Sequence, residues 1–180
     1  MLVRERMSPH PVVIGPDTSL PDAITLMREK KVRRLPVLDH QQHLVGIVSD
    51  KDLLYASPSP ASSLSVWEMH TLLNKLTVDK LMTHDVITVT EDTPVEEAAR
   101  LMADHRIGGL PVVKDDALVG IITETDLFRS FLELLGGRRH GVRLTAFTPG
   151  AKGTVAKIAS AISAIGGDIV GVGFSETSTV

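Results

Sequence analysis

The sequence predicts a mixed α/β fold of the α+β kind, with two pseudo-symmetric β-α-β-β-α repeats followed by a partial β-α-β segment. Residues 7–54 and 82–128 align with a single one-residue gap, so one unit is present twice. In both copies the hydrophobic pattern changes between strand-like and helical spacing in the same order. A repeat of about 75 residues is too long for a solenoid unit. We therefore expect two small units packed face to face, with a ligand crevice between them.

The composition indicates an ordered globular protein. Hydrophobic residues make up 43% of the chain and charged residues 23%, which is typical of a packed domain. The net charge of −3 gives no electrostatic reason to expect nucleic acid or an acidic membrane as a partner. The absence of cysteine excludes disulfides and thiolate chemistry. Because residues 1–6 lack the apolar core of a signal peptide, and no long apolar run occurs, we expect a cytoplasmic protein.

Each copy is expected to open with a short strand, at residues 11–14 and 86–89, and to continue into a helix. The run Thr93-Pro94-Val95-Glu96 has the pattern of a capping box with proline at the first helical position. Apolar residues at i, i+3, i+4 and i+7 then predict one buried helical face in each copy. These residues are Val95, Ala98, Ala99 and Met102 in the second copy and Leu20, Ala23, Ile24 and Met27 in the first.

Two further strands and a second helix complete each unit. Leu-Pro-Val opens the first of these strands at 35–37 and again at 110–112, and residues 44–48 and 118–122 form the second. The polar connections between them have the length of hairpin loops. The second helix begins near Asp50 in one copy and near Glu124 in the other.

A seven-residue motif recurs at the end of each hairpin: glycine, two apolar residues, Ser or Thr, any two residues, then Asp. It reads Gly46-Ile47-Val48-Ser49-Asp50-Lys51-Asp52 and Gly120-Ile121-Ile122-Thr123-Glu124-Thr125-Asp126. On these motifs, residues 1–135 resemble a tandem cystathionine-β-synthase (CBS) domain pair, or Bateman module. The resemblance implies repeats at 1–55 and 77–136, joined at 56–76 by a linker with a short helix.

The Ser or Thr of each motif stands where a strand ends and a helix begins. Free backbone N–H groups and the positive end of the helix dipole face the same place. Asp52 and Asp126 fall one turn into these helices and can accept hydrogen bonds from two vicinal hydroxyls, as on a ribose. The alternative is that Ser49 and Thr123 are helix N-caps and nothing more. Capping by the hydroxyl alone does not explain an Asp in both copies, so we favour a ligand site.

The resemblance implies two adenine pockets, each between the first strand and the segment before the Pro-Val strand. The first pocket would use Val12, Val32, Ile47, Ser49 and Asp52, and the second Ile87, Ile107, Ile121, Thr123 and Asp126. The family's phosphate contacts come from basic residues just before Leu-Pro-Val, here Arg33 and Arg34. Their forked donors suit phosphate oxygens. The alternative for these two arginines is a solvated strand edge.

The second copy departs from this pattern, because Gly108-Gly109 replaces the two arginines. It therefore lacks a phosphate clamp of its own. His105 and Arg106 lie close by but precede the matching positions. We expect the two pockets to be inequivalent.

Two other groups of residues are candidate sites. Trp67, His70 and Leu73 follow the linker and offer either a partner-binding face or, as we favour, a contact buried between the repeats or in a dimer. His40 and His43 lie in a polar loop without a third ligand, so no metal site is expected. The sequence also contains no P-loop and no glycine-rich dinucleotide motif.

Residues 141–180 carry a different pattern. Residues 143–147 alternate like a strand, 155–162 have helical spacing, and 168–174 form another strand-like run. This order resembles the first half of an ACT domain, a small-molecule-sensing module. A CBS pair followed by such a segment resembles the acetoin-utilisation type of regulatory protein.

The sequence thus predicts a non-catalytic regulatory sensor that needs no cofactor and binds AMP, ADP, ATP or S-adenosylmethionine. Ligand binding would change how the repeats or subunits pack. Two alternatives remain, a small enzyme acting on a nucleotide and a passive dimerisation module with vestigial clefts. Apolar residues beside the buried helical stripes, such as Leu26 and Leu134, predict a homodimer. A regulator also implies a protein partner that it regulates.

Overall fold

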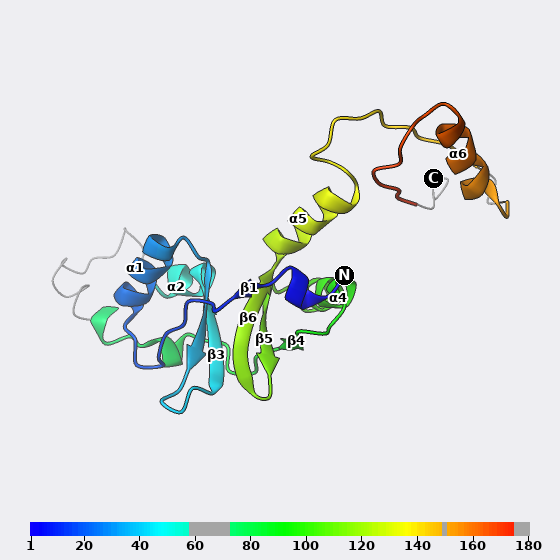
Figure 1. The fold of residues 1–180 in the computed structure, drawn as a ribbon. Helices are drawn as coiled ribbons and strands as arrows, with labels where there is room; N and C mark the ends of the chain where they lie inside the picture. The colour runs from blue at the N-terminus through cyan, green and yellow to red at the C-terminus, as the bar shows by residue number, and fades with distance from the viewer. Residues whose placement is uncertain (58–72, 149–150, 175–180) are drawn as a thin grey trace. The chain divides into compact units, whose positions relative to one another are not determined.

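The computed structural model describes residues 1–57, 73–148 and 151–174. It divides into two compact units, Met1–Leu127 and Phe128–Val180. The first unit holds both repeats up to Leu127, and Figure 1 shows its strands in the middle and helices outside them. The linker expected at 56–76 falls largely outside the described residues, as do Trp67 and His70. Leu73 is partly buried against the core of the first repeat.

The first repeat consists of a helix, a hairpin and a second helix. These are α1 (Leu20–Lys30), β2 (Arg34–Leu38), β3 (Leu44–Ser49) and α2 (Asp50–Ala56). The predicted face of α1 is buried, with Leu20, Ala23 and Met27 in the core and Ile24 partly buried against it. The hairpin pairs antiparallel as expected from the two apolar runs.

The second repeat has the same plan and a larger sheet. Its elements are β4 (Val89–Thr90), α4 (Val95–His105), β5 (Gly109–Lys114), β6 (Ala117–Thr123) and α5 (Glu124–Leu134). A two-residue strand from the N-terminus, β1 (Ser8–Pro9), joins this sheet and gives the order β1-β6-β5-β4.

The two repeats start their first helices differently. Ser19 caps α1, because its side chain accepts a hydrogen bond from the Asp22 backbone N–H at 3.3 Å. The capping box predicted at Thr93 is wrong. Its Oγ1 accepts a hydrogen bond from the Thr90 backbone N–H at 3.0 Å, so it closes the preceding turn. Pro94 then stands at the N-cap, with no side-chain oxygen to offer the helix.

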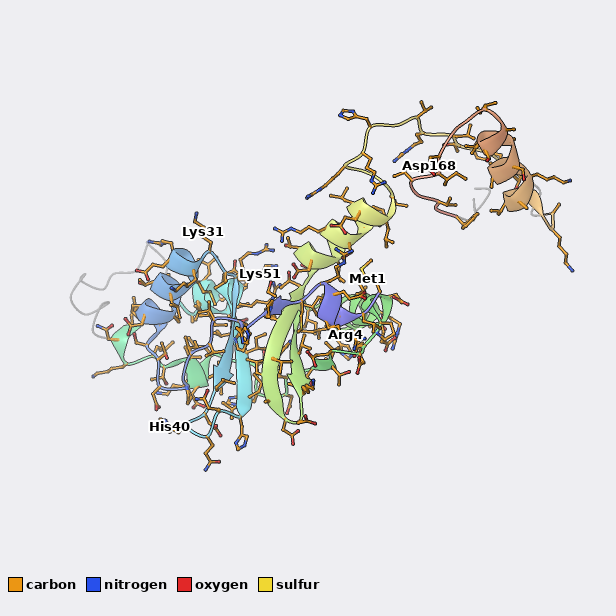
Figure 2. All side chains as sticks on the ribbon, viewed as in Figure 1. Met1, Arg4, Lys31, His40, Lys51 and Asp168 are labelled. Atoms are coloured by element: carbon orange, nitrogen blue, oxygen red, sulfur yellow. The ribbon has the colours of Figure 1, made fainter. Side chains whose placement is uncertain are left out.

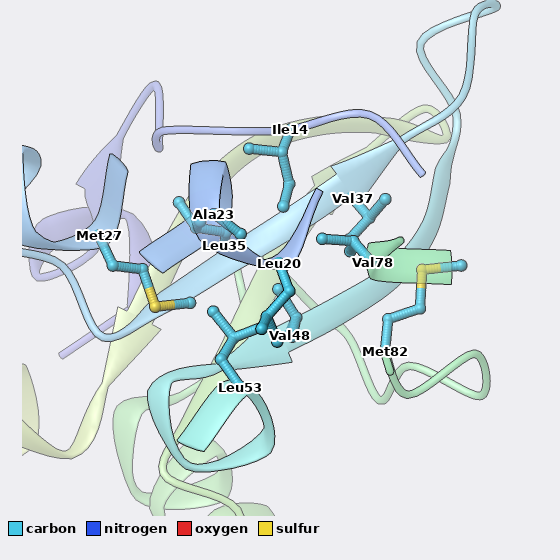
Figure 3. Packing of buried hydrophobic residues seen from close by; sticks show 10 residues of the cluster. All are labelled: Ile14, Leu20, Ala23, Met27, Leu35, Val37, Val48, Leu53, Val78 and Met82. Atoms are coloured by element: carbon cyan, nitrogen blue, oxygen red, sulfur yellow. The ribbon is translucent and has the colours of Figure 1, made fainter. Parts of the chain in front are cut away.

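The opening segments of the two copies are exchanged. A short 3₁₀ helix, η1 (Val3–Glu5), buries Val3 in the core of the second repeat. The equivalent helix after the linker, η2 (Val78–Lys80), buries Val78 in the core of the first. Figure 3 shows Val78 and Met82 among the packed side chains of that first core. Each repeat is therefore completed by residues that precede the other one in the chain.

Equivalent backbone hydrogen bonds hold both exchanged segments. Val3 N donates to Thr93 O at 2.9 Å, and Val78 N donates to Thr18 O at 2.9 Å. Further along, Ser8 pairs with Ile121 in β6, while Thr83 and Ile47 exchange two backbone bonds of 2.9 and 3.0 Å. Each exchanged segment thus adds to the edge of the other repeat's hairpin.

The strand predicted at residues 11–14 is reduced to one parallel bridge, from Ile14 to Val37. Ile14 N donates to Pro36 O at 3.2 Å and Leu38 N donates to Ile14 O at 2.9 Å, so this stretch lies on the β2 side of the hairpin, whereas the exchanged segment pairs on the β3 side. In the second copy the predicted strand at 86–89 is shortened to Val89–Thr90.

The second unit contains a predicted helix but not the predicted strands. The helix α6 (Thr154–Ala164) covers the segment with helical spacing. The strands expected at 143–147 and 168–174 do not form, and the ACT-like β-α-β order is absent from the described residues. Strands need partners, and a segment of this size buries too little apolar surface to hold a sheet alone. No described residue from 151 to 174 is buried.

Candidate ligand-binding site

The strand–helix junction of the first repeat is built around Ser49 and Asp52. Ser49 ends β3 and caps α2, with its Oγ accepting from Asp52 N at 3.3 Å. Asp52 Oδ2 accepts from Ser49 N at 2.8 Å and from Ser49 Oγ at 2.6 Å. The two residues therefore form a reciprocal cap, in which each side chain satisfies the backbone N–H of the other.

The second repeat reproduces the carboxylate side of this arrangement. Asp126 Oδ2 accepts from Thr123 N at 2.9 Å and from Thr123 Oγ1 at 2.7 Å. The inference that capping does not explain the recurring Asp is therefore wrong, because an acidic residue at this position is part of the cap. The cap uses Oδ2 in both copies. For Asp52, Oδ1 takes no hydrogen bond from the described residues, so one carboxylate oxygen remains to accept from a ligand.

The period-two alternation of the strands sorts the predicted pocket residues onto two faces. Val48 and Ile122 point into their cores and are fully buried. Their neighbours in the motif, Ile47 and Ser49 in one copy and Ile121 and Thr123 in the other, lie on the opposite face. Ile47 and Ser49 are half-buried there, and Ile121 is buried.

The other apolar candidates lie against the cores. Val12 and Val32 are partly buried against the first core, and Ile87 and Ile107 against the second. The structure thus keeps each predicted set within its own repeat. It brings the motif residues together on one face and leaves these four at the edge of the core.

Arg33 and Arg34 reach from the first repeat to the second. Arg33 Nη2 donates to Thr125 Oγ1 at 3.3 Å. The Arg34 side chain lies along Gly108 and Gly109: a Cβ built on Gly109 would lie 3.1 Å from Arg34 Cδ, and one built on Gly108 would overlap Arg34 Nη2. The solvated strand edge, the alternative for these arginines, therefore fits Arg33, which is exposed, better than the half-buried Arg34.

The surroundings of Arg34 carry both signs of charge. Burial lowers the pKa of its guanidinium from the ordinary value, and the neighbouring Arg33 lowers this pKa further. The carboxylates of Glu124, Asp50 and Asp52 act in the opposite direction. Two cations and three carboxylates thus gather where the two motifs meet. An anionic ligand would add a partner for the cations.

The sequence did not single out a hollow between α1 and α2. It has a volume of about 270 Å³. Its walls are mostly apolar, and only Val32 belongs to the predicted pockets. The lining residues are Ile24, Met27, Arg28, Val32, Asp50, Leu53, Leu54 and Ser57. Neither Ser49 nor Asp52 lines the hollow, so it does not contain the hydroxyl and carboxylate of the predicted ribose site.

The histidine pair of the β2–β3 hairpin is exposed. His40 projects from the end of this hairpin (Figure 2), and its Nε2 lies 4.0 Å from Asp17 Oδ2. His43 Nδ1 lies 3.4 Å from Asp39 Oδ2. Within residues 1–57, 73–148 and 151–174, no three His, Asp or Glu side chains gather as metal ligands. In the same ranges no helix has the length and apolarity needed to cross a bilayer.

Comparison with known proteins identifies the repeats. The family model for the CBS domain matches twice, at residues 3–59 and 78–133. CBSX2, a chloroplastic CBS domain-containing protein of Arabidopsis thaliana, is 37% identical over 140 residues, which are 68% of this chain and 59% of that protein. The chain therefore spans little more than half of that relative.

Solved structures show the same fold. The structure of CBSX2 in complex with AMP matches with a TM-score of 0.60 at 37% identity, covering 73% of this chain and 96% of that one. The CBS domain pair of MJ0100, in complex with 5′-methylthioadenosine and S-adenosyl-L-methionine, matches with a TM-score of 0.62 at 31% identity, covering 77% and 98%. A Vibrio cholerae protein assigned to acetoin utilization (AcuB) matches with a TM-score of 0.62 at 33% identity, covering 79% and 98%. With two family matches, a duplicated β-α-β-β-α unit and a capped Ser/Thr–Asp junction in each copy, this chain belongs to the CBS domain proteins and carries the domain as a tandem pair.

Proposed function

We propose that this protein is a non-catalytic sensor that binds an adenine nucleotide or a related adenosyl ligand between its two CBS repeats. The observation that carries the proposal is the pair of equivalent Ser/Thr–Asp junctions, whose motif faces turn away from the cores, with two arginines beside them. The complexes of CBSX2 with AMP and of MJ0100 with adenosyl compounds support it.

In this proposal the carboxylate of each Asp accepts hydrogen bonds from the ribose hydroxyls. The cap holds the carboxylate in place, so the ligand does not have to order it. The motif isoleucines and the valines or isoleucines at the core edge would contact the adenine. The sensor responds because the ligand has different affinities for two arrangements of the repeats or subunits.

A thermal-shift panel of AMP, ADP, ATP, NAD and S-adenosylmethionine tests this function. A ligand present at 100 times its Kd should stabilise the protein by about 2.7 kcal/mol and raise Tm by roughly 5–15 °C. The absence of any shift across the panel would instead favour the passive module. Turnover of a bound nucleotide, followed by chromatography of the incubated ligand, would favour the enzyme.

We also propose a homodimer that forms through the second helices of the repeats. On α2, Leu54 and Tyr55 are 69% and 85% exposed. On α5, taken by itself, Phe128, Phe131 and Leu134 are exposed. Exposed apolar side chains on adjacent turns are typical of an interface. A sedimenting monomer at micromolar concentration would contradict this part. We place the sensor and the protein that it regulates in the cytoplasm, where free adenine nucleotides are available, and fractionation tests that location.

The ACT likeness of residues 141–180 remains part of the proposal in a reduced form. We propose that this segment forms its strands only when it pairs with another chain. Residues 138–180 expressed alone should then show no cooperative thermal transition as a monomer.

A further inference from the structure

The residues at the start of β2 and β5 occupy equivalent positions with different side chains. Arg34 pairs with Ser49 across the first hairpin, and Gly109 pairs with Thr123 across the second. One residue earlier, Arg33 O accepts from Asp50 N at 3.0 Å, and Gly108 O accepts from Glu124 N at 3.1 Å. The backbone is thus the same in both repeats. The arginines of the first repeat correspond to two glycines in the second.

Arg106 does not replace these arginines. It ends α4 in the left-handed conformation, at φ 55° and ψ 38°. Lys31 ends α1 with φ 55° and ψ 39°. Arg106 is therefore the counterpart of Lys31, and the second repeat presents only backbone at the position of the clamp.

The Arg34 side chain fills the space that the two glycines leave open. A Cβ on Gly109 would lie 3.1 Å from Arg34 Cδ and 3.4 Å from Nε, so the stem of the arginine runs where a side chain opposite Thr123 would stand. A Cβ on Gly108 would overlap Arg34 Nη2 and lie 2.6 Å from Glu124 Oε2. The guanidinium thus lies beside the first residue of α5. Any larger residue at 108 would displace it.

Arg33 reaches the same junction by another route. Its Nη2 donates to Thr125 Oγ1 at 3.3 Å, and Thr125 is the residue before Asp126. Both cations of the first repeat are therefore held at the motif of the second. At the matching positions the second repeat has glycines, which offer no side chain to the first motif. The carboxylates of Asp50 and Asp52 at the first motif also raise the pKa of Arg34, but less than Glu124 does.

We propose that Arg33 and Arg34 of the first repeat are the phosphate clamp of the second repeat's pocket. The Thr123–Asp126 pocket then takes an adenine nucleotide with a 5′-phosphate. The Ser49–Asp52 pocket takes an adenosyl ligand without phosphate. Glu124 holds Arg34 in place when the pocket is empty, and the phosphate competes for the same guanidinium. The proposal rests on the adenosyl-sensor function and adds the division of labour between the pockets.

Calorimetry with AMP and adenosine on single-pocket variants tests this division. Asp52→Ala leaves the second pocket intact, and Asp126→Ala leaves the first. In the Asp52→Ala background, replacing Arg33 and Arg34 by alanine should weaken AMP binding about 10- to 300-fold and change adenosine binding by less than about 3-fold. In the Asp126→Ala background the same double replacement should change the affinity for neither AMP nor adenosine. The matched control is Arg100→Ala with Lys114→Ala, which removes two positive charges from exposed ion pairs elsewhere on the second repeat.

A second pair of variants leaves the arginines and carboxylates in place. Gly108→Ala should displace the Arg34 guanidinium and weaken AMP binding about 3- to 30-fold with adenosine unaffected. Gly15→Ala is its control, because a Cβ there meets nothing within 4 Å. Loss of AMP affinity only in the Asp126→Ala background, or equal losses for adenosine and AMP, would overturn the clamp and leave the sensor function standing. Binding of neither ligand by the wild type would overturn both.

Discussion

The two CBS repeats differ where they face each other and agree where they face their cores. Leu35, Val37 and Val48 are fully buried in the first repeat, and Leu110, Val112 and Ile122 are fully buried at the matching places in the second. At the junctions, by contrast, the first repeat has Arg33 and Arg34 where the second has Gly108 and Gly109. Asp126 is only 9% exposed, whereas Asp52 is half-buried. Packing constrains both copies alike, and the residues on which the proposed division of roles rests lie on the facing surface.

The largest effect should come from the shared core. Leu35→Ala and Leu110→Ala each remove a fully buried side chain and should each lower the free energy of unfolding by about 2–5 kcal/mol. Urea unfolding of the two variants checks this. Since the exchanged segments tie the repeats together, the two repeats should unfold in one transition in each variant. If the protein instead showed two transitions, and each variant shifted only one of them, the repeats would be independent.

The next effect concerns the carboxylates of the two junctions. Asp52→Ala and Asp126→Ala should each weaken adenosyl binding at their own pocket by about 2–4 kcal/mol, or roughly 30- to 1,000-fold, through loss of ribose hydrogen bonds to a charged acceptor. Calorimetry measures this loss. The same Asp also completes the helix cap, so an alanine could weaken binding by destabilising the junction. The control is a conservative Asp→Asn variant, which keeps one acceptor oxygen for the cap. Unchanged affinity in both alanine variants would leave the Asp with its capping role alone.

A smaller effect separates capping from ligand binding. Ser49→Ala removes the side chain that accepts from Asp52 N, and should lower the free energy of unfolding by about 0.5–2 kcal/mol without ligand. Ser49→Gly should cost only a few tenths of a kcal/mol. Thermal unfolding of the ligand-free variants checks both. An alanine variant as stable as the wild type would mean that the 3.3 Å bond contributes nothing.

The smallest effect compares the hairpin turns. In the first repeat the backbone N–H groups of His43 and Gln41 lower the pKa of Asp39 below its ordinary value. A lowered pKa means that the carboxylate stabilises the fold above the ordinary value of about 3.9 and loses that contribution as pH falls through the folded pKa. The second turn instead places Asp115 and Asp116 at positive φ.

We therefore expect the stability difference between the wild type and Asp39→Asn to shrink as pH falls from 5 to 2. Carboxyl chemical shifts should show Asp39 titrating below 3.9. A difference that stays constant over this range would contradict the role of the two backbone bonds.

The local elements could be predicted from the sequence because their signals are local. The apolar runs on either side of a short polar loop predicted both hairpins, and the i, i+3, i+4, i+7 spacing predicted the buried faces of α1 and α4. The strand predicted at 11–14 is reduced to the single bridge between Ile14 and Val37, because the extent of strand pairing is a long-range property. The segments near Ser8 and Thr83 pair with the hairpins of the opposite repeats, and no local pattern marks that choice.

The site was predictable to the level of residue types and motif position. The motif located Ser49, Asp52, Thr123 and Asp126 at strand–helix junctions, and the structure confirms that placement. The direction of Arg34 was not predictable, because it depends on the packing of one repeat against the other. One signal was available in the sequence. The glycines at 108 and 109 have no side chains, and the space that they leave can be filled by a long side chain from elsewhere.

The exchange of opening segments has a consequence for the folding of the chain during synthesis and for its origin by gene duplication. Val3 is synthesised before the first repeat yet belongs to the core of the second, and the core of the first repeat is incomplete until Val78 and Met82 have been synthesised. An isolated repeat would lack its complement, and a second molecule of the same repeat would carry the matching segment. Gene duplication turns that domain swap between two chains into one within a single chain, at a high effective concentration.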